Sequence, residues 1–90
     1  MDSYTERMHQ VNKAVFEERE RQNEKWGRQK HSYLRWYTIL GEEVGEVAEA
    51  LQQDMVNAKS TDADDLYKEL IQVAAVASAF AEQVKSESKR

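Results

Sequence analysis

The stretch from residue 33 to residue 55, YLRWYTILGEEVGEVAEALQQDM, contains the clearest structural pattern in this 90-residue chain. Its apolar residues recur at intervals of three or four, a spacing that places side chains on one face of an α-helix. That face comprises Tyr37, Leu40, Val44, Val47, Leu51 and Met55. Ser32 belongs to the residue types that cap a helix N-terminus. The pattern therefore predicts a helix over residues 33–55 with Ser32 as its cap.

A first helix is predicted upstream of this stretch. Ser3-Tyr4-Thr5-Glu6 has the form of a capping box, in which the serine and the glutamate each satisfy a free backbone N–H. The apolar face that follows comprises Tyr4, Met8, Val11 and Val15. Glu17 and Arg21 then stand four residues apart, as an ion pair on a solvated helix face would. Residues 23–32 contain Gly27 and three basic residues, and we interpret them as a loop.

A third helix is predicted after the polar residues 57–62. Thr61 or Asp62 can cap it, and Asp64 and Asp65 fall in its first turn, where the helix dipole favours acids. Its predicted buried face comprises Leu66, Leu70, Val73, Ala77 and Val84. The charged residues 85–90 are expected to fray.

Composition favours an all-α fold for the whole chain. There is no proline and only three glycines, so few residues interrupt a helix. We expect residues 1–90 to form one domain, an antiparallel helical bundle. Because a chain of this length buries only a modest core, oligomerisation is expected to add stability.

Charge and motif content exclude several classes of protein. The formal net charge is −4, from 13 basic and 17 acidic residues, which argues against binding of duplex nucleic acid. No cysteine is present, so neither a disulfide framework nor a thiolate metal site can form. The N-terminus does not resemble a signal peptide, and no apolar run has membrane-spanning length. We expect a soluble, cytoplasmic protein without a membrane partner.

The acidic residues of the central stretch have no basic neighbours. No Lys or Arg lies between Arg35 and Lys59, although Glu46 lies four residues after Glu42 and three residues after Glu43. Like charges at that spacing destabilise a helix by roughly 0.2–0.5 kcal/mol per pair. We therefore expect a compensating cation, either a metal ion or a side chain from elsewhere in the fold.

A second set of oxygen ligands is predicted on the third helix. Relative to the apolar faces, Glu69 has the same angular offset as Glu43, and Gln72 has the same offset as Glu46. If the two helices pack antiparallel, these edges meet. Such an oxygen-rich cluster suits Mg²⁺, or Mn²⁺, better than Zn²⁺, because neither helix contains His or Cys. The alternative is that the acids are solvated or pair with arginines elsewhere.

These residues also resemble a known family. The pattern Glu42-Glu43-x-x-Glu46, followed by Glu69 on a later helix, is similar to that of the MazG-like nucleoside triphosphate pyrophosphohydrolases. The resemblance extends through Gln22, Lys25-Trp26-Gly27 and residues 68–77, KELIQVAAVA, and it covers roughly residues 15–82. It is nearest to the short, single-domain members found in bacteria and phages. It implies the all-α bundle of that family, completed by assembly into a homodimer or homotetramer.

The resemblance also implies a reaction. Family members hydrolyse a nucleotide between its α and β phosphates and release a monophosphate and pyrophosphate. Carried over to this chain, Glu43, Glu46 and Glu69 would be magnesium ligands, and Glu42 a ligand or the group that orients water. The family usually has Asp where this chain has Gln72, so the predicted ligand set has one negative charge fewer. Asp65, one turn before Glu69, could partly substitute.

The family resemblance implies that the nucleotide is bound near the predicted loop. Gln22, Lys25 and Trp26 would contact it, with Trp26 stacking on a base and Lys25 meeting a phosphate. The alternative is that Trp26 plugs the end of the bundle while Lys25 is solvated. Trp36 and Tyr37 are expected in the core or at a subunit interface. Gly41, Gly45 and Ala48 form a stripe of small residues that would let another helix approach closely.

Three hypotheses for function follow. The first is a magnesium-dependent pyrophosphohydrolase that acts on a (d)NTP or a related nucleotide. The second is a protein that binds nucleotides, to sequester or sense them, with little or no turnover; the glutamine at position 72 motivates it. The third is a purely structural helical dimer.

Overall fold

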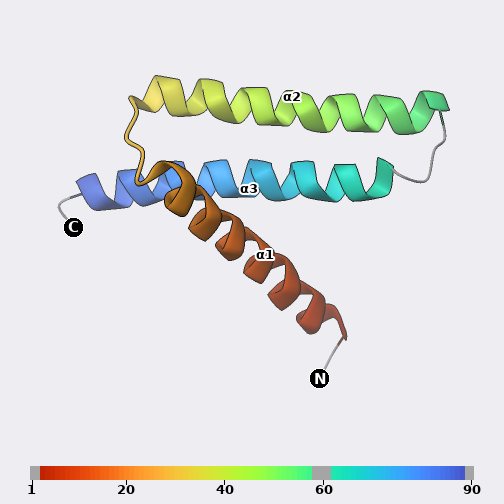
Figure 1. Cartoon of the computed structure of the whole chain (residues 1–90), viewed down its shortest axis with the longest axis horizontal. Helices are drawn as coiled ribbons and strands as arrows, with labels where there is room; N and C mark the ends of the chain where they lie inside the picture. Colours follow the sequence, from red (N-terminus) through yellow and green to blue (C-terminus); the bar gives the residue numbers. More distant parts are fainter. Residues whose placement is uncertain (1–2, 58–61, 89–90) are drawn as a thin grey trace.

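The structure, a computed structural model, describes residues 3–57 and 62–88, with side chains described for residues 3–52 and 66–88. It contains three helices: α1 (Ser3–Trp26), α2 (Tyr33–Asn57) and α3 (Asp62–Glu87). Within the described residues there is no strand, so the predicted all-α class is confirmed (Figure 1). None of the helices in the described part of the chain combines the length and apolar character that crossing a membrane requires.

The helix boundaries follow local signals. α1 runs to Trp26, so the prediction of a loop from residue 23 was wrong for its first four residues. Gly27, with φ 71°, ends the helix there, and its N–H donates to the carbonyl of Asn23 at 2.8 Å. The predicted cap of α2 is confirmed, because the Arg35 N–H donates to Ser32 Oγ at 3.1 Å.

The other helix ends also differ from the predicted ones. α2 ends at Asn57, two residues beyond the prediction, and α3 continues to Glu87 through residues that we expected to fray. The proposed caps of α3, Thr61 and Asp62, and its first-turn acids, Asp64 and Asp65, lie outside the residues whose side chains are described.

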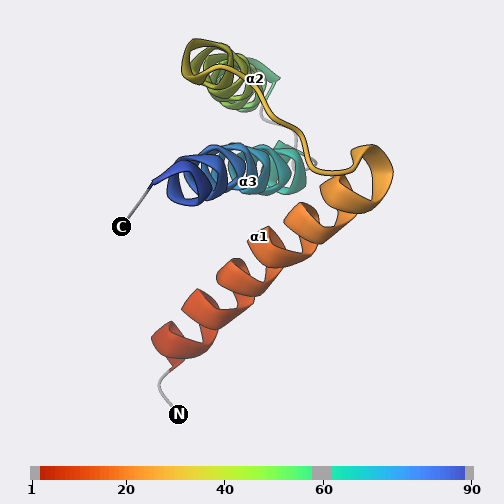
Figure 2. The same cartoon turned by 90° about the vertical axis from the view of Figure 1, so that its left-hand side faces the viewer.

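The three helices form an open arrangement rather than a closed bundle. α2 and α3 pack side by side as an antiparallel hairpin, and α1 packs on α3 instead of α2. Both views place α3 between the other two helices (Figures 1 and 2). The N-terminal half of α1 extends away from the hairpin. The helices therefore form an angular particle with extents of 48 × 37 × 24 Å.

The largest buried side chain of the described core is Trp36, which is 4% exposed. Its ring stacks on Phe80 with an interplanar angle of 12° and packs against Val76. Its indole Nε1 donates to Gln83 Oε1 at 2.7 Å. Gln83 Nε2 donates in turn to the carbonyl of His31 at 2.7 Å, which attaches the α1–α2 loop to α3. Trp36 thus belongs to the core, one of the two places predicted for it.

Several residues predicted to be buried are exposed. They are Tyr4, Met8 and Val11 on α1, Tyr37, Val44 and Leu51 on α2, and Leu70, Ala77 and Val84 on α3. The apolar residues of α2 and of α3 are spread over a wider part of the helix surface than the face by which these two helices contact each other. The contact between these helices uses one flank of each arc, marked by Ala50 and Val76, and leaves the other flank exposed. The side chain of Met55 lies outside the described residues.

One predicted ion pair is replaced by two others. Glu17 lies 3.9 Å from Lys13 rather than pairing with Arg21. Arg21 instead donates to both carboxylate oxygens of Glu18, at 2.9 and 2.6 Å. The bidentate geometry explains the choice, because a guanidinium fork gains two parallel hydrogen bonds from one carboxylate.

Candidate metal centre and adjoining cavity

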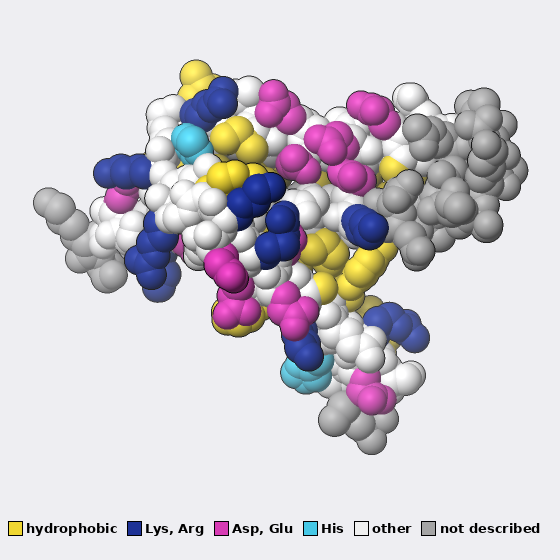
Figure 3. All heavy atoms as spheres, in the orientation of Figure 1, with side chains coloured by type: hydrophobic (Ala, Val, Ile, Leu, Met, Phe, Trp, Pro, Cys, Tyr) yellow, Lys and Arg dark blue, Asp and Glu magenta, His cyan; other side chains and the backbone are white. Residues whose placement is uncertain are grey.

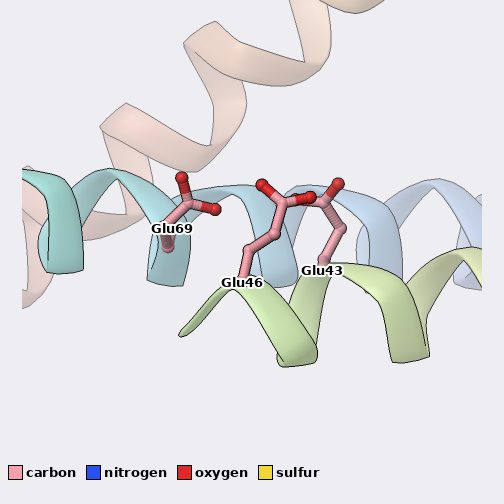
Figure 4. Close-up of side chains that lie close together, drawn as sticks. All are labelled: Glu43, Glu46 and Glu69. Carbon is pink, nitrogen blue, oxygen red and sulfur yellow. The ribbon is translucent and has the colours of Figure 1, made fainter. Parts of the chain in front are cut away.

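Three carboxylates from two helices meet at the junction of α2 and α3. Glu43 and Glu46 come from α2 and Glu69 comes from α3, and each offers an oxygen within 4.8 Å of the others. Figure 4 shows that all three side chains project to the same side of the hairpin, toward α1. Because Glu43 and Glu46 lie three residues apart on a helix, they share an edge, and antiparallel packing brings Glu69 against it. These three residues are called the acidic cluster below.

The acidic cluster is electrostatically strained. Burial raises the pKa of Glu43, and the charges of Glu46 and Glu69 raise it further, with smaller contributions from Glu42 and Glu18. One carboxylate oxygen of Glu69 has almost no contact with solvent. Acidic side chains also gather along α2 on the face drawn in Figure 3. A cation placed among these oxygens would relieve the repulsion; that such a cation binds here stays a prediction.

The structure places Glu42 and Gln72 beside the acidic cluster rather than within it. Glu42 is exposed and acts on Glu43 through its charge. Gln72 is half-buried and faces α1, where its Oε1 accepts a weak hydrogen bond from Gln22 Nε2 at 3.5 Å. The side chain of Asp65, the residue expected to substitute for a missing acid, lies outside the described residues.

Glu18 of α1 is a member of this neighbourhood that the sequence analysis missed. Its side chain is only 12% exposed, and it accepts hydrogen bonds from Arg21 and, at 3.3 Å, from Gln22 Nε2. The hydrogen bond from Arg21 is the main cause of its lowered pKa, to which Gln72 also contributes. The signal was present in the sequence, because Val11, Val15, Glu18 and Gln22 continue one helical face at intervals of four, three and four.

A cavity of about 230 Å³ adjoins the acidic cluster. It is lined by Gln22, Trp26, Gln29, Trp36, Ile39, Glu43, Gln72 and Val76, so all three helices contribute to it. Its volume is below the range of roughly 300–1,000 Å³ that is typical of small-molecule sites, so it suits part of a ligand, such as a planar ring. Glu43 belongs to both the cavity and the acidic cluster, and it joins them into one continuous site.

The residues predicted to contact a nucleotide are partly brought together. Gln22 and Trp26 line the cavity, and Trp26 remains half-exposed there. Lys25 does not line it; its Nζ lies 4.9 Å from the centre of the Trp26 ring instead, a cation–π contact. Trp36, for which we predicted no ligand contact, forms part of the cavity wall. Its position between core and cavity could not be read from helical periodicity alone.

Comparison with known proteins returned no matching family model, no similar curated protein and no similar solved structure. The site must therefore be interpreted from its own chemistry. Clustered carboxylates beside a cavity with two indole rings and three amide side chains can hold a hard cation and accept a planar polar ligand.

Proposed function

We propose that this protein is a magnesium-dependent nucleotide pyrophosphohydrolase that cleaves a (d)NTP or a related nucleotide to a monophosphate and pyrophosphate. One observation carries the proposal. The acidic cluster of Glu43, Glu46 and Glu69 adjoins, through Glu43, a cavity that contains Trp26 and Trp36. A metal-ligand set and an aromatic pocket side by side are what a metal-assisted reaction on a nucleotide requires.

The donor set fits a hard divalent cation. Mg²⁺ is typically bound through one or two carboxylates, with water and substrate phosphates completing its coordination shell. Glu43, Glu46 and Glu69 supply the carboxylates, and the pKa of Glu43 is raised by burial and by the repulsion that the cation would offset. Mn²⁺ would satisfy the same ligands. When bound, the ion supplies charge neutralisation at the phosphates and lowers the pKa of a bound water.

The chain's own residues supply binding and orientation. A base between Trp26 and Trp36 would lie beside Glu43, so its phosphates would extend along the acidic cluster. The amides of Gln22 and Gln72 can donate to or accept from the base or the sugar. Glu42, which is exposed and directly precedes Glu43, would accept a proton from attacking water without being a ligand.

The proposal includes an assembly. The helices would form the bundle of the all-α nucleoside triphosphate pyrophosphohydrolase type as a homodimer or homotetramer that acts in the cytoplasm. The open arrangement of α1 supports a further partner, because a closed three-helix bundle would leave no such overhang.

A second candidate is a nucleotide-binding protein with little turnover. It is favoured by Gln72, which adds no charge to the site and shares a hydrogen bond with Gln22. The enzyme remains the first choice, because the three clustered carboxylates and Glu42, the acid to which the family resemblance gives the water-orienting role, are all present.

Product analysis distinguishes these candidates. The protein is incubated with a panel of ribo- and deoxyribonucleoside triphosphates, with Mg²⁺ or with a chelator, and the products are separated by ion-exchange chromatography. The enzyme predicts monophosphate and pyrophosphate in equal amounts, only with the metal. Binding measured by calorimetry without any product would favour the second candidate. If neither binding nor product were detected, the hypothesis of a purely structural helical dimer would remain.

A further inference from the structure

Three amide side chains line the cavity beside the acidic cluster, and they differ in how far the protein already uses their hydrogen-bonding groups. Gln22 belongs to α1, Gln29 to the loop between α1 and α2, and Gln72 to α3. An amide offers two N–H donors and a carbonyl acceptor, which complement the donors and acceptors on the edge of a nucleobase. The amide best able to recognise a ligand is the one that is not already bonded within the protein.

Gln22 and Gln72 belong to a hydrogen-bond network that joins α1 to α3. Gln22 Oε1 accepts from Arg19 Nη1 at 2.8 Å. Its Nε2 donates to Glu18 Oε2 at 3.3 Å and to Gln72 Oε1 at 3.5 Å. The pKa of Glu18 is lowered chiefly by its hydrogen bond with Arg21 and further by one with Gln72. Most of the hydrogen-bonding groups of these two amides are therefore already used between the helices.

Gln29 differs from the other two amides. It is exposed, and its side chain has no hydrogen-bond partner within the described part of the chain. It lines the cavity of about 230 Å³ together with Trp26 and Trp36. It also lines a larger hollow of about 590 Å³, to which Arg28 and Lys30 contribute. A ring that entered the cavity would therefore meet an amide with its donors and its acceptor available.

The loop that carries Gln29 is fixed at both ends. On one side Gly27 ends α1 with φ 71°, and its N–H donates to the carbonyl of Asn23 at 2.8 Å. On the other side Gln83 Oε1 accepts from the His31 N–H at 3.1 Å, and Gln83 Nε2 donates to the His31 carbonyl at 2.7 Å. A single residue separates Gln29 from each of these fixed points. Such a loop is ordered before a ligand arrives, so less entropy is lost on binding.

We infer that Gln29 selects the base of the bound nucleotide, through hydrogen bonds from its amide to the edge of a ring stacked against Trp26 and Trp36. Stacking on an indole does not distinguish one base from another, because every base has a π-face. Discrimination needs directional hydrogen bonds, since a base with the wrong edge leaves a donor or an acceptor unpaired. The inference rests on the proposed function for a nucleotide as the ligand, but not for its hydrolysis.

The test measures binding, so that it does not depend on turnover. Nucleoside triphosphates with a methylene group between the α and β phosphates cannot be cleaved there. Their Kd values, for adenine, guanine, cytosine and uracil, are measured by calorimetry in Mg²⁺. The wild type should prefer at least one base, and Gln29→Leu, which cannot form the hydrogen bonds, should reduce that preference about 10-fold. Gln10→Leu, at an exposed position of α1 that does not line the cavity, should keep the wild-type preference.

Gln29→Glu distinguishes base recognition from a purely structural role of the loop. A carboxylate accepts hydrogen bonds but cannot donate them. At ring position 4, cytosine has an amino donor where uracil has a carbonyl acceptor. The variant should therefore change the ratio of the two Kd values about 10-fold in favour of cytosine. A residue that only shaped the loop would change both affinities alike.

The outcomes separate this inference from the proposed function. Failure of the wild type to bind any analogue, equal affinities for all four, or a preference that persists in folded Gln29→Leu and Gln29→Glu would each overturn the role of Gln29. The unmodified triphosphates test hydrolysis independently. If they released no pyrophosphate while the base preference depended on Gln29, the enzyme would be rejected and the inference would stand.

Discussion

At the scale of single residues, Glu43 connects the fold to the proposed chemistry. Burial and, after it, the charges of Glu46 and Glu69 raise its pKa, so the fold disfavours its ionised form. The spacing of Glu43, Glu46 and Glu69 was visible in the sequence, because a helical wheel fixes which residues share an edge. The helical face that contains Glu18 was also visible in the sequence, but what that face meets depends on how α1 crosses α3, which no local pattern encodes.

Metal binding should stabilise the protein through the acidic cluster. A ligand at a hundred times its Kd stabilises the folded state by roughly 2.7 kcal/mol, and each kcal/mol raises the Tm of a small domain by about 4–8 °C. We expect Mg²⁺ or Mn²⁺ titration to raise the Tm of the wild type, and Glu46→Gln to lose most of that rise. Glu49→Gln, which removes a charge outside the cluster, should keep it. A Tm unaffected by high millimolar metal, with or without nucleotide, would argue against the site.

Introducing an acid at position 72 distinguishes the pyrophosphohydrolase from a nucleotide-binding protein with little turnover. Gln72→Asp adds one negative charge beside Glu43 and shortens the side chain that accepts the hydrogen bond from Gln22. The variant should bind Mg²⁺ more tightly and depend more on it for folding, because an uncompensated, partly buried charge destabilises the fold. For an enzyme adapted to glutamine, turnover should change only modestly. An inactive wild type beside an active variant would favour the binder.

At the scale of elements, the sequence predicted the existence and order of the three helices but not how they pack. Periodicity and the Ser32 cap sufficed for α2 because both are local. Which flank of α2 faces α3 is decided by long-range contacts, such as the hydrogen bond from Trp36 to Gln83. The predicted apolar faces of α2 and α3 were therefore centred between two flanks of each helix. One flank packs against the other helix, and the other flank is exposed.

The attachment of α1 to α3 should depend on pH. Arg19 donates from Nε to Glu82 Oε2 at 2.8 Å, and this hydrogen bond is the main cause of the lowered pKa of Glu82. A carboxylate with a lowered pKa stabilises the fold above its unfolded value, near 4.5, and loses that contribution as pH falls through the folded value.

Glu82→Gln should therefore lower the free energy of unfolding at pH 7 by at most about 1 kcal/mol, because the pair is partly exposed. The difference from the wild type should shrink as pH falls below 4.5. Urea titrations at several pH values measure it, with Glu24→Gln as a control for net charge. A difference that stayed constant between pH 7 and pH 3 would mean that the ion pair does not cause it.

The junction of α1 and α2 should report nucleotide binding through fluorescence. Trp26 is half-exposed and lines the cavity, so a stacked base should quench its emission, and Trp26→Ala should weaken binding while the helical circular dichroism persists. Trp36→Phe should retain the quench from Trp26, although it loses the hydrogen bond to Gln83. If only Trp36→Phe abolished the quench, the base would stack on the buried indole instead.

At the scale of the whole molecule, the all-α class and the meeting of Glu43, Glu46 and Glu69 could be predicted from the sequence. The angular shape of the molecule could not be predicted. It depends on the point at which the contacts between α1 and α3 end, and no local sequence pattern gives that point. The surplus of apolar residues, first interpreted as core, is partly surface in the isolated chain. That difference supports the homo-oligomeric assembly included in the proposed function.

The central claim is that the acidic cluster holds the ion on which nucleotide hydrolysis depends. The most direct test is the steady-state rate of pyrophosphate release at saturating Mg²⁺ for the wild type, Glu69→Gln and Glu49→Gln, each checked for helical content. Removing even an outer residue of a metal site costs about 10- to 100-fold in metal affinity or activity, so Glu69→Gln should lose at least about 100-fold. Glu49→Gln should retain the wild-type rate, and a chelator should abolish it. Wild-type turnover in Glu69→Gln, or turnover that persists without metal, would contradict the account.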